Sequence, residues 1–208
     1  MRRLIHTIVR WLNKGWQAVA NRRDKVSCQE FSQILAWTIS RSVLENKNKP
    51  PSSELRRFAI SVCPNAQENV VTCEILFLLG FLMSQICALQ IKEQDCLDEL
   101  LLGLYSGLVS MVRSNSEDFE NVARSRYQAY LEPYGFDIER MRHQKSGTIP
   151  WKAILARLGS NLRNDFDFET DESDFVPASL ALGIYFEENL KFVRKSLNTL
   201  ELRNSGSR

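Results

Sequence analysis

The sequence lacks the residues and motifs that most catalytic and metal sites require. Its 208 residues include only two histidines, His6 and His143, so a metal site built from several histidines is excluded within one chain. The nucleotide-binding patterns GxxxxGK[ST] and GxGxxG and the zinc-protease pattern HExxH do not occur. The Glu-x-x-His pairs of dinuclear carboxylate centres are missing as well. We therefore predict no catalytic residue, no metal ligand and no cofactor. An enzyme without local motifs is the alternative, which a cleft holding His143 and Glu139 would support.

Cysteine usage gives no indication of a disulfide framework. The chain has five cysteines, Cys28, Cys63, Cys73, Cys87 and Cys96. Their number is odd, none forms a CxxC pair, and four of them lie in apolar helical surroundings. This pattern favours free, buried thiols in a reducing compartment. The apolar run near the N-terminus is broken by Arg10 and has no small-residue cleavage site, so we expect no signal peptide. The expected location is the cytoplasm.

No segment shows the alternating apolar pattern of a β-strand. Apolar positions instead recur with a period near 3.6 along almost the whole chain. The length suits one domain, so we predict a single all-α domain over residues 1–208, a bundle of about seven to eight helices. Capping boxes are expected at Ser27 with Glu30 and at Asn65 with Glu68, and Pro177 is expected to begin the last helix, which runs to about Arg203.

Two apolar segments within residues 65–113 predict an antiparallel helical hairpin, because the connection between them is very short. Small residues recur at helical spacing on both segments, where another backbone can approach closely inside the domain or at a homodimer seam. These predicted close-packing positions are Gly80, Ser84, Gly103 and Gly107. The first segment is short for a membrane span and contains Gln85 and Gln90. The hairpin is therefore predicted to be a buried core, with a membrane hairpin as the alternative.

Residues 1–26 are predicted to contain a basic amphipathic helix. At 100° per residue, apolar side chains that include two tryptophans fall on one side and cations on the other. Such a helix can lie on an anionic membrane surface, dock into a partner's groove, or cover the protein's own core. The residues predicted to contact a partner or a membrane are Arg3, Arg10, Trp11, Lys14 and Trp16.

Residues 164–176 are predicted to form an acidic loop. Six carboxylates and no cation occur between Asp165 and Asp174. The first three ligand positions of a calcium-binding EF-hand loop are filled, but Thr170 replaces its turn glycine and Val176 its closing glutamate, so we reject a calcium site. Because this loop and the N-terminal region carry opposite charges, we expect the two to meet within one molecule or across a dimer.

The stretch between Arg124 and Arg163 is basic and contains several aromatic residues. Cations for phosphates and rings for stacking are thus both available, although no nucleic-acid-binding motif frames them. The residues of this candidate polyanion surface are Arg124, Arg126, Tyr127, Arg140 and Arg142.

These observations together favour binding over chemistry. We expect a cytoplasmic protein-interaction or regulatory module with a protein partner, which includes the case of a homodimer. The first alternative is a peripheral membrane protein anchored at an anionic surface by the N-terminal helix. Nucleic-acid binding through residues 124–163 is the less favoured alternative, because a net charge of +2 gives it little support.

Overall fold

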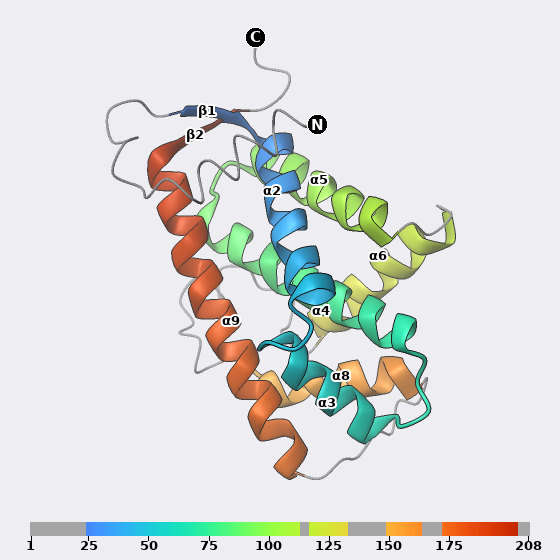
Figure 1. Cartoon of the computed structure of the whole chain (residues 1–208). Helices are drawn as coiled ribbons and strands as arrows, with labels where there is room; N and C mark the ends of the chain where they lie inside the picture. The colour runs from blue at the N-terminus through green and yellow to red at the C-terminus, as the bar shows by residue number, and fades with distance from the viewer. Residues whose placement is uncertain (1–23, 113–116, 133–148, 164–171, 204–208) are drawn as a thin grey trace.

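Figure 1 shows the computed structural model of the chain, which describes residues 24–112, 117–132, 149–163 and 172–203. The described residues contain seven α-helices, one π-helical turn and two short strands, which confirms the predicted all-α bundle. In chain order the elements are β1 (Asp24–Ser27), α2 (Cys28–Ser40), η2 (Arg41–Glu45), α3 (Ser52–Val62), α4 (Glu68–Gln90), α5 (Gln94–Val112), α6 (Glu117–Leu131), α8 (Trp151–Arg163), α9 (Glu172–Thr199) and β2 (Leu200–Arg203).

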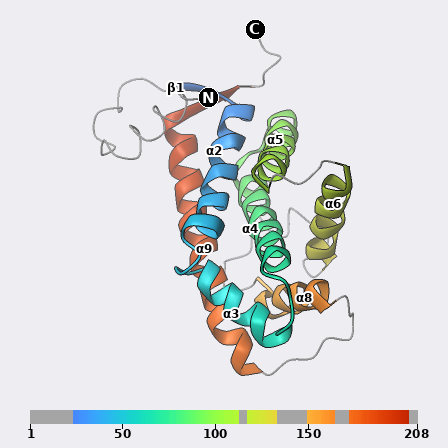
Figure 2. The same cartoon turned by 45° about the vertical axis from the view of Figure 1, so that its right-hand side comes forward.

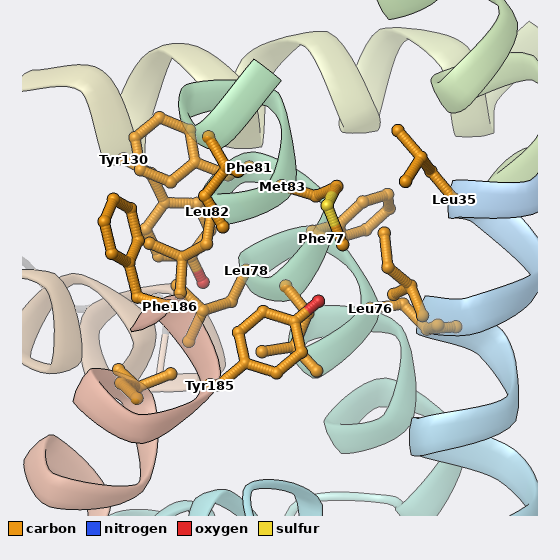
Figure 3. Packing of buried hydrophobic residues seen from close by; sticks show 14 of the residues in the cluster. Leu35, Leu76, Phe77, Leu78, Phe81, Leu82, Met83, Tyr130, Tyr185 and Phe186 are labelled. Atoms are coloured by element: carbon orange, nitrogen blue, oxygen red, sulfur yellow. The ribbon is translucent and has the colours of Figure 1, made fainter. Parts of the chain in front are cut away.

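Helix α4 is the centre of the bundle. It contacts every other described helix, and Figures 1 and 2 show those helices arranged around it. A helix that is apolar on most sides must be covered on all of them, and the side chains of α4 do point in several directions. In Figure 3 they meet Leu35 of α2, Tyr130 of α6, and Tyr185 and Phe186 of α9.

By length and composition α4 could cross a membrane, and it is the single described helix that meets this test. Most of its apolar window, 83%, is nevertheless buried inside the bundle. That burial is what the core helix of a folded domain requires, because lipid and protein neighbours cannot cover the same side chains.

Helices α4 and α5 follow each other across residues 91–93 and run in opposite directions (Figure 2). The closest packing of α5, however, is with α2, which runs parallel to it. A Cβ atom added to Gly103 would lie 2.1 Å from Ser32 Oγ, and one added to Gly107 would lie 2.7 Å from Ala36 Cβ. At Gly80 of α4 the added atom would lie 2.7 Å from Leu108 Cδ1. These glycines therefore allow helices to approach more closely than a larger residue would permit.

The capping box at the start of α2 forms as predicted, since Glu30 N donates to Ser27 Oγ (3.1 Å) and Ser27 N donates to Glu30 Oε2 (3.0 Å). The one predicted for α4 was wrong. The N-cap of α4 is Gln67, whose side chain makes no capping bond. Glu68 is already in the first helical turn, where Arg56 of α3 binds its carboxylate.

Two predicted helix boundaries were also wrong. Residues 24–26, predicted to belong to the N-terminal helix, are not helical, and the last helix does not extend to Arg203. Asp24–Ser27 and Leu200–Arg203 form a two-stranded parallel sheet, with Asp24 opposite Leu200. Leu200 is buried and Leu202 packs against the core, while Glu201 lies between them. This period of two places both leucines on one face, which a strand allows and a helix does not.

Helix α9 begins before the proline that was predicted to start it. Its first residue is Glu172, so Pro177 lies inside the helix and residues 172–176 are not part of a loop. Phe175 explains the early start, because its ring packs 5.3 Å from that of Phe58 of α3 and thus fixes the first turns of α9 on the core. The rest of the predicted acidic loop, residues 164–171, lies outside the described residues.

The expectation that all five thiols are free was wrong for two of them. Cys28 and Cys96 form a disulfide, with their Cα atoms 6.0 Å apart. The parallel packing of α2 and α5 brings their first turns together, and with them these two cysteines. Cys63, Cys73 and Cys87 are free.

Candidate functional site

Helix α9 carries exposed apolar side chains on a face that the core does not use. Val176 and Leu180 are 65% exposed and Ile184 is 50% exposed. Residues four apart lie on one side of a helix, so the three form a continuous row, which we call the α9 stripe. The opposite side of the helix is buried through Phe175, Ala178, Leu182, Tyr185 and Phe186.

Among the described residues, α9 is the one helix that carries more than one of the large exposed apolar side chains. Five other large apolar side chains are similarly exposed, but each lies alone on its own element: Leu44, Ile60, Val70, Leu102 and Val122. Single exposed apolar residues are normal on a protein surface, whereas a row of them indicates a site of contact.

Charged residues follow the stripe along α9. Glu188 is exposed and Glu187 is half-buried one turn beyond Ile184. Lys191 and Arg194 are exposed further towards β2, and Arg194 Nε donates to Gln90 Oε1 of α4 at 3.3 Å. The solvent side of α9 thus changes from apolar to acidic to basic along its length.

A second candidate is a buried polar cluster that joins α4, α6 and α8. Glu74 of α4 is 4% exposed and forms an ion pair with Arg126 of α6, Nε to Oε1 2.7 Å. Asn161 of α8 bridges the pair: its Nδ2 donates to Glu74 Oε2 (3.4 Å) and its Oδ1 accepts from Arg126 Nη1 (3.3 Å). Each of these buried polar groups therefore has a partner from another helix, as buried charge requires.

The electrostatics of this cluster resemble those of an active site, but its burial does not. Burial raises the pKa of Glu74, and Arg126 and Asn161 oppose that rise. Burial, together with the nearby Glu74 carboxylate, holds the pKa of Tyr130 well above its ordinary value. Because Glu74 and Tyr130 are both shielded by α6 and α8, a substrate would have to displace a helix to reach them. We interpret the cluster as a structural link between three helices.

The thiols of Cys73 and Cys87 are likewise unsuited to nucleophilic chemistry. Burial raises the pKa of Cys87 to about 12. Burial and then the carboxylate of Glu74 raise the pKa of Cys73. Since the thiolate is the reactive form of cysteine, both residues stay protonated and inert near neutral pH. Among the described residues no three His, Cys, Asp or Glu side chains form a group that could hold a metal ion.

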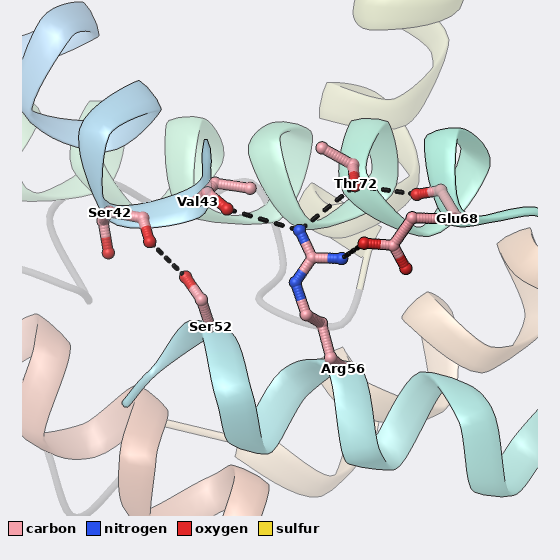
Figure 4. Close-up of polar contacts among 6 residues, drawn as sticks. All are labelled: Ser42, Val43, Ser52, Arg56, Glu68 and Thr72. Atoms are coloured by element: carbon pink, nitrogen blue, oxygen red, sulfur yellow. Dashed lines mark hydrogen bonds and ion pairs between the residues drawn. The ribbon is translucent and has the colours of Figure 1, made fainter. Parts of the chain in front are cut away.

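A third polar cluster surrounds Arg56 of α3 (Figure 4). Its guanidinium pairs with Glu68 and donates from Nη2 to Thr72 Oγ1 (3.1 Å) and to the carbonyl oxygen of Val43 (3.3 Å). All three partners are within the protein, and the Arg56 side chain is only 11% exposed. The cluster therefore holds α3, η2 and α4 together.

The structure describes three of the five predicted polyanion residues, and two of these, Arg126 and Tyr127, contact the protein's own interior. Arg124 is exposed, while Arg126 points to Glu74. Tyr127 packs its ring edge-on against Phe81 and Tyr105, at 5.5 and 5.6 Å, and its hydroxyl accepts from Gln85 Nε2 at 3.3 Å. The remaining two, Arg140 and Arg142, lie outside the described residues, as do Glu139 and His143.

The predicted N-terminal contact residues also lie outside the described part of the chain. They are Arg3, Arg10, Trp11, Lys14 and Trp16. The described chain begins at Asp24, in β1 beside the end of α9.

Sequence reasoning missed both the α9 stripe and Glu74. The stripe could have been found, because Val176, Leu180 and Ile184 are spaced by four and are offset from the core positions of the same helix. Glu74 is the one acid between residues 69 and 92, so its position invites a search for a buried partner. Nothing in the sequence pointed to Arg126 or Asn161 as that partner.

No protein-family model, no curated protein and no solved structure matches this chain. The α9 stripe and the charges beside it are therefore the features from which a function is proposed.

Proposed function

We propose that this protein is a protein-interaction module that binds an amphipathic helix of a partner along the α9 stripe. The observation that carries the proposal is the row of Val176, Leu180 and Ile184, exposed on a helix whose other side is fixed in the core. A rigid helix with an apolar row on its surface can pair with the apolar face of a second helix.

The size of the stripe determines the strength of this interaction. Full burial of a Val, Leu or Ile side chain contributes about 1.5–3 kcal/mol, so the part still exposed on these three residues contributes together about 4 kcal/mol. Loss of translational and rotational freedom on association costs at least about 4 kcal/mol. The stripe alone therefore only offsets the cost of association, so a measurable complex needs further contacts.

Further contacts would come from the residues next to the stripe. Glu187 and Glu188 follow it by one turn, so a partner helix with cations beside its apolar face fits best. Such charge pairs on the rim raise the association rate and select the partner more than they raise affinity.

Photo-crosslinking at Leu180 tests the proposal. With p-benzoylphenylalanine at position 180 of the full chain in its native cells, we expect a discrete protein adduct. The matched control carries the same group at position 102, because Leu102 is 72% exposed but stands alone on α5. The adduct yield at position 180 should be about ten times that at position 102, which corresponds to a tenfold higher affinity of the partner for the stripe than for the control surface.

The second control removes the neighbours of the crosslinker. Val176→Ser together with Ile184→Ser should abolish the adduct at position 180 while leaving the fold intact, because both side chains point to solvent. Equal yields at positions 180 and 102, or a yield that the two serines leave unchanged, would show that the stripe binds no partner.

A further inference from the structure

The α9 stripe lies on the helix beside which the N-terminal segment enters the fold. β1 pairs in parallel with β2, and Asp24 is opposite Leu200. β2 follows α9 without an intervening residue (Figure 1). Because the two strands run in the same direction, Asp24, the first described residue, lies at the end of the sheet that adjoins α9.

A helix over residues 3–20 would be long enough to reach the stripe from β1. At 1.5 Å per helical residue, Val176 lies about 36 Å along α9 from Leu200. Residues 21–23 span about 10 Å when extended, and a helix over residues 3–20 is about 27 Å long. Their sum is about 37 Å, so a helix over residues 3–20 laid along α9 would extend as far as the start of the stripe. The exposed side of α9 between stripe and sheet, at Lys191, Arg194 and Asn198, leaves that path open.

The chemistry of the segment also fits this surface. One side of residues 3–20 is apolar by helical spacing, with Leu4, Ile8 and Leu12 in one row four residues apart, the same spacing as in the stripe. No acid occurs before Asp24, while Glu187 and Glu188 follow the stripe. The apolar row of the segment therefore complements the stripe, and its cations complement Glu187 and Glu188, whereas Lys191 and Arg194 nearer the sheet have no acidic counterpart in it.

We infer that residues 3–20 of this same chain are the helix that occupies the α9 stripe when no partner is bound. The inference rests on the proposed function, because it takes the stripe as the partner site and adds its regulation. A tethered segment is present at millimolar effective concentration and is largely spared the cost of bimolecular association. It can therefore cover a stripe that binds a free helix only weakly, and a partner must displace it.

Crosslinking from the N-terminal segment tests the inference in the purified full chain. With p-benzoylphenylalanine at Ile8, on the apolar side, we expect an adduct in the peptide 173–187, which cleavage after glutamate releases and which holds the stripe. The matched control carries the same group at Arg10, on the polar side, and should give at most about one tenth of that yield. Leu180→Glu should lower the Ile8 adduct by a similar factor.

A mixture of unlabelled and nitrogen-15-labelled chains identifies the molecule that supplies the segment. Adducts in which both peptides carry the same isotope show that segment and stripe belong to one chain. Adducts of mixed isotope would overturn the inference, because a second copy would then supply the helix. Absence of any adduct between Ile8 and residues 173–187 would overturn the inference too. It would also be overturned if the segment bound vesicles of phosphatidylserine and phosphatidylcholine and gave no adduct with α9.

The Leu12→Glu variant separates this inference from the proposed function. It should release the segment and raise the partner adduct at position 180 several-fold. If Ile8 gives no α9 adduct but position 180 still captures a partner, the inference fails and the proposed function stands. If Ile8 labels α9 and position 180 captures no partner even in Leu12→Glu, the proposed function fails and the intramolecular contact stands.

Discussion

Glu74 is the single charged side chain that the described part of the chain buries almost completely. It contributes to the fold through its partners, since Arg126 and Asn161 come from two other helices. A buried ion pair is costly to break because the remaining partner keeps an uncompensated charge. Its contribution to stability can therefore be measured with Glu74→Gln, which replaces the carboxylate by a neutral amide, and with Glu74→Ala, which removes the whole carboxyl group.

The pKa of Glu74 leads to a prediction about pH. Burial raises the pKa of this carboxyl in the folded protein, so the folded state binds its proton more tightly than the unfolded state does. The stability that this proton confers is complete below the ordinary pKa of 4.5 and is lost as pH rises through the higher pKa of the folded state. Urea unfolding of wild type and Glu74→Gln should therefore show a difference that grows in favour of the glutamine variant over this window.

The Glu74→Ala variant provides the contrast. It removes the partner of Arg126 without replacing its hydrogen bonds, so we expect the free energy of unfolding to fall by about 3 kcal/mol at neutral pH. A glutamine variant as unstable as the alanine variant, or a stability difference from wild type that does not change with pH, would contradict the assigned role of the buried carboxyl.

At the scale of elements, the closest contact in the bundle is between α2 and α5. A Cβ atom at Gly103 would lie 2.1 Å from Ser32 Oγ, which is too close for any real contact. Gly103→Ala must displace the Ser32 side chain or push α2 and α5 apart, and we expect a loss of about 1–3 kcal/mol, the usual cost of overpacking. Thermal and urea unfolding measure this loss directly.

Gly183 of α9 offers the matched control. A Cβ atom there would lie 3.7 Å from Trp151 Nε1, an ordinary van der Waals distance. Alanine is the better helix former, so Gly183→Ala should raise stability by about 0.5–1 kcal/mol. If both alanine variants changed the free energy of unfolding equally, helix propensity would determine the effect of Gly103→Ala, and the close approach of α2 to α5 would not.

The elements also show how far the sequence could be interpreted. Helical periodicity predicted the bundle and the central α4, because a helix apolar on most sides needs covering on most sides. It did not predict that α5 packs closest to α2, since spacing of Gly103 and Gly107 identifies a ridge but not the helix that fills it. The strand at Leu200 was missed because two alternating leucines are too few to reveal a period of two. The Glu74 cluster was missed because its members are far apart in the chain.

At the scale of the whole molecule, the two ends of the bundle are held together by different means. Near one end, β1 pairs with β2, and the disulfide of Cys28 and Cys96 joins α2 to α5 directly after β1. Towards the other end, the ion pairs of Arg56 and Arg126 join α3 and α6 to α4, and a hydrogen bond from Asn161 to Glu74 joins α8 to it. Asp24, the first residue that the structure describes, lies at the same end of the bundle as the disulfide.

The disulfide gives the last prediction. The bond closes a loop between residues separated by 68 positions in the sequence, and a loop of that length should stabilise the folded state by about 4 kcal/mol through the entropy of the unfolded chain. Alkylation in denaturant without reductant should label three cysteines, and dithiothreitol should raise that number to five and lower the urea midpoint. A Cys28→Ser, Cys96→Ser double variant should resemble the reduced protein and should not respond to dithiothreitol. Five labelled cysteines without reductant would show that α2 and α5 are held by packing alone, and the urea midpoint should then be the same with and without dithiothreitol.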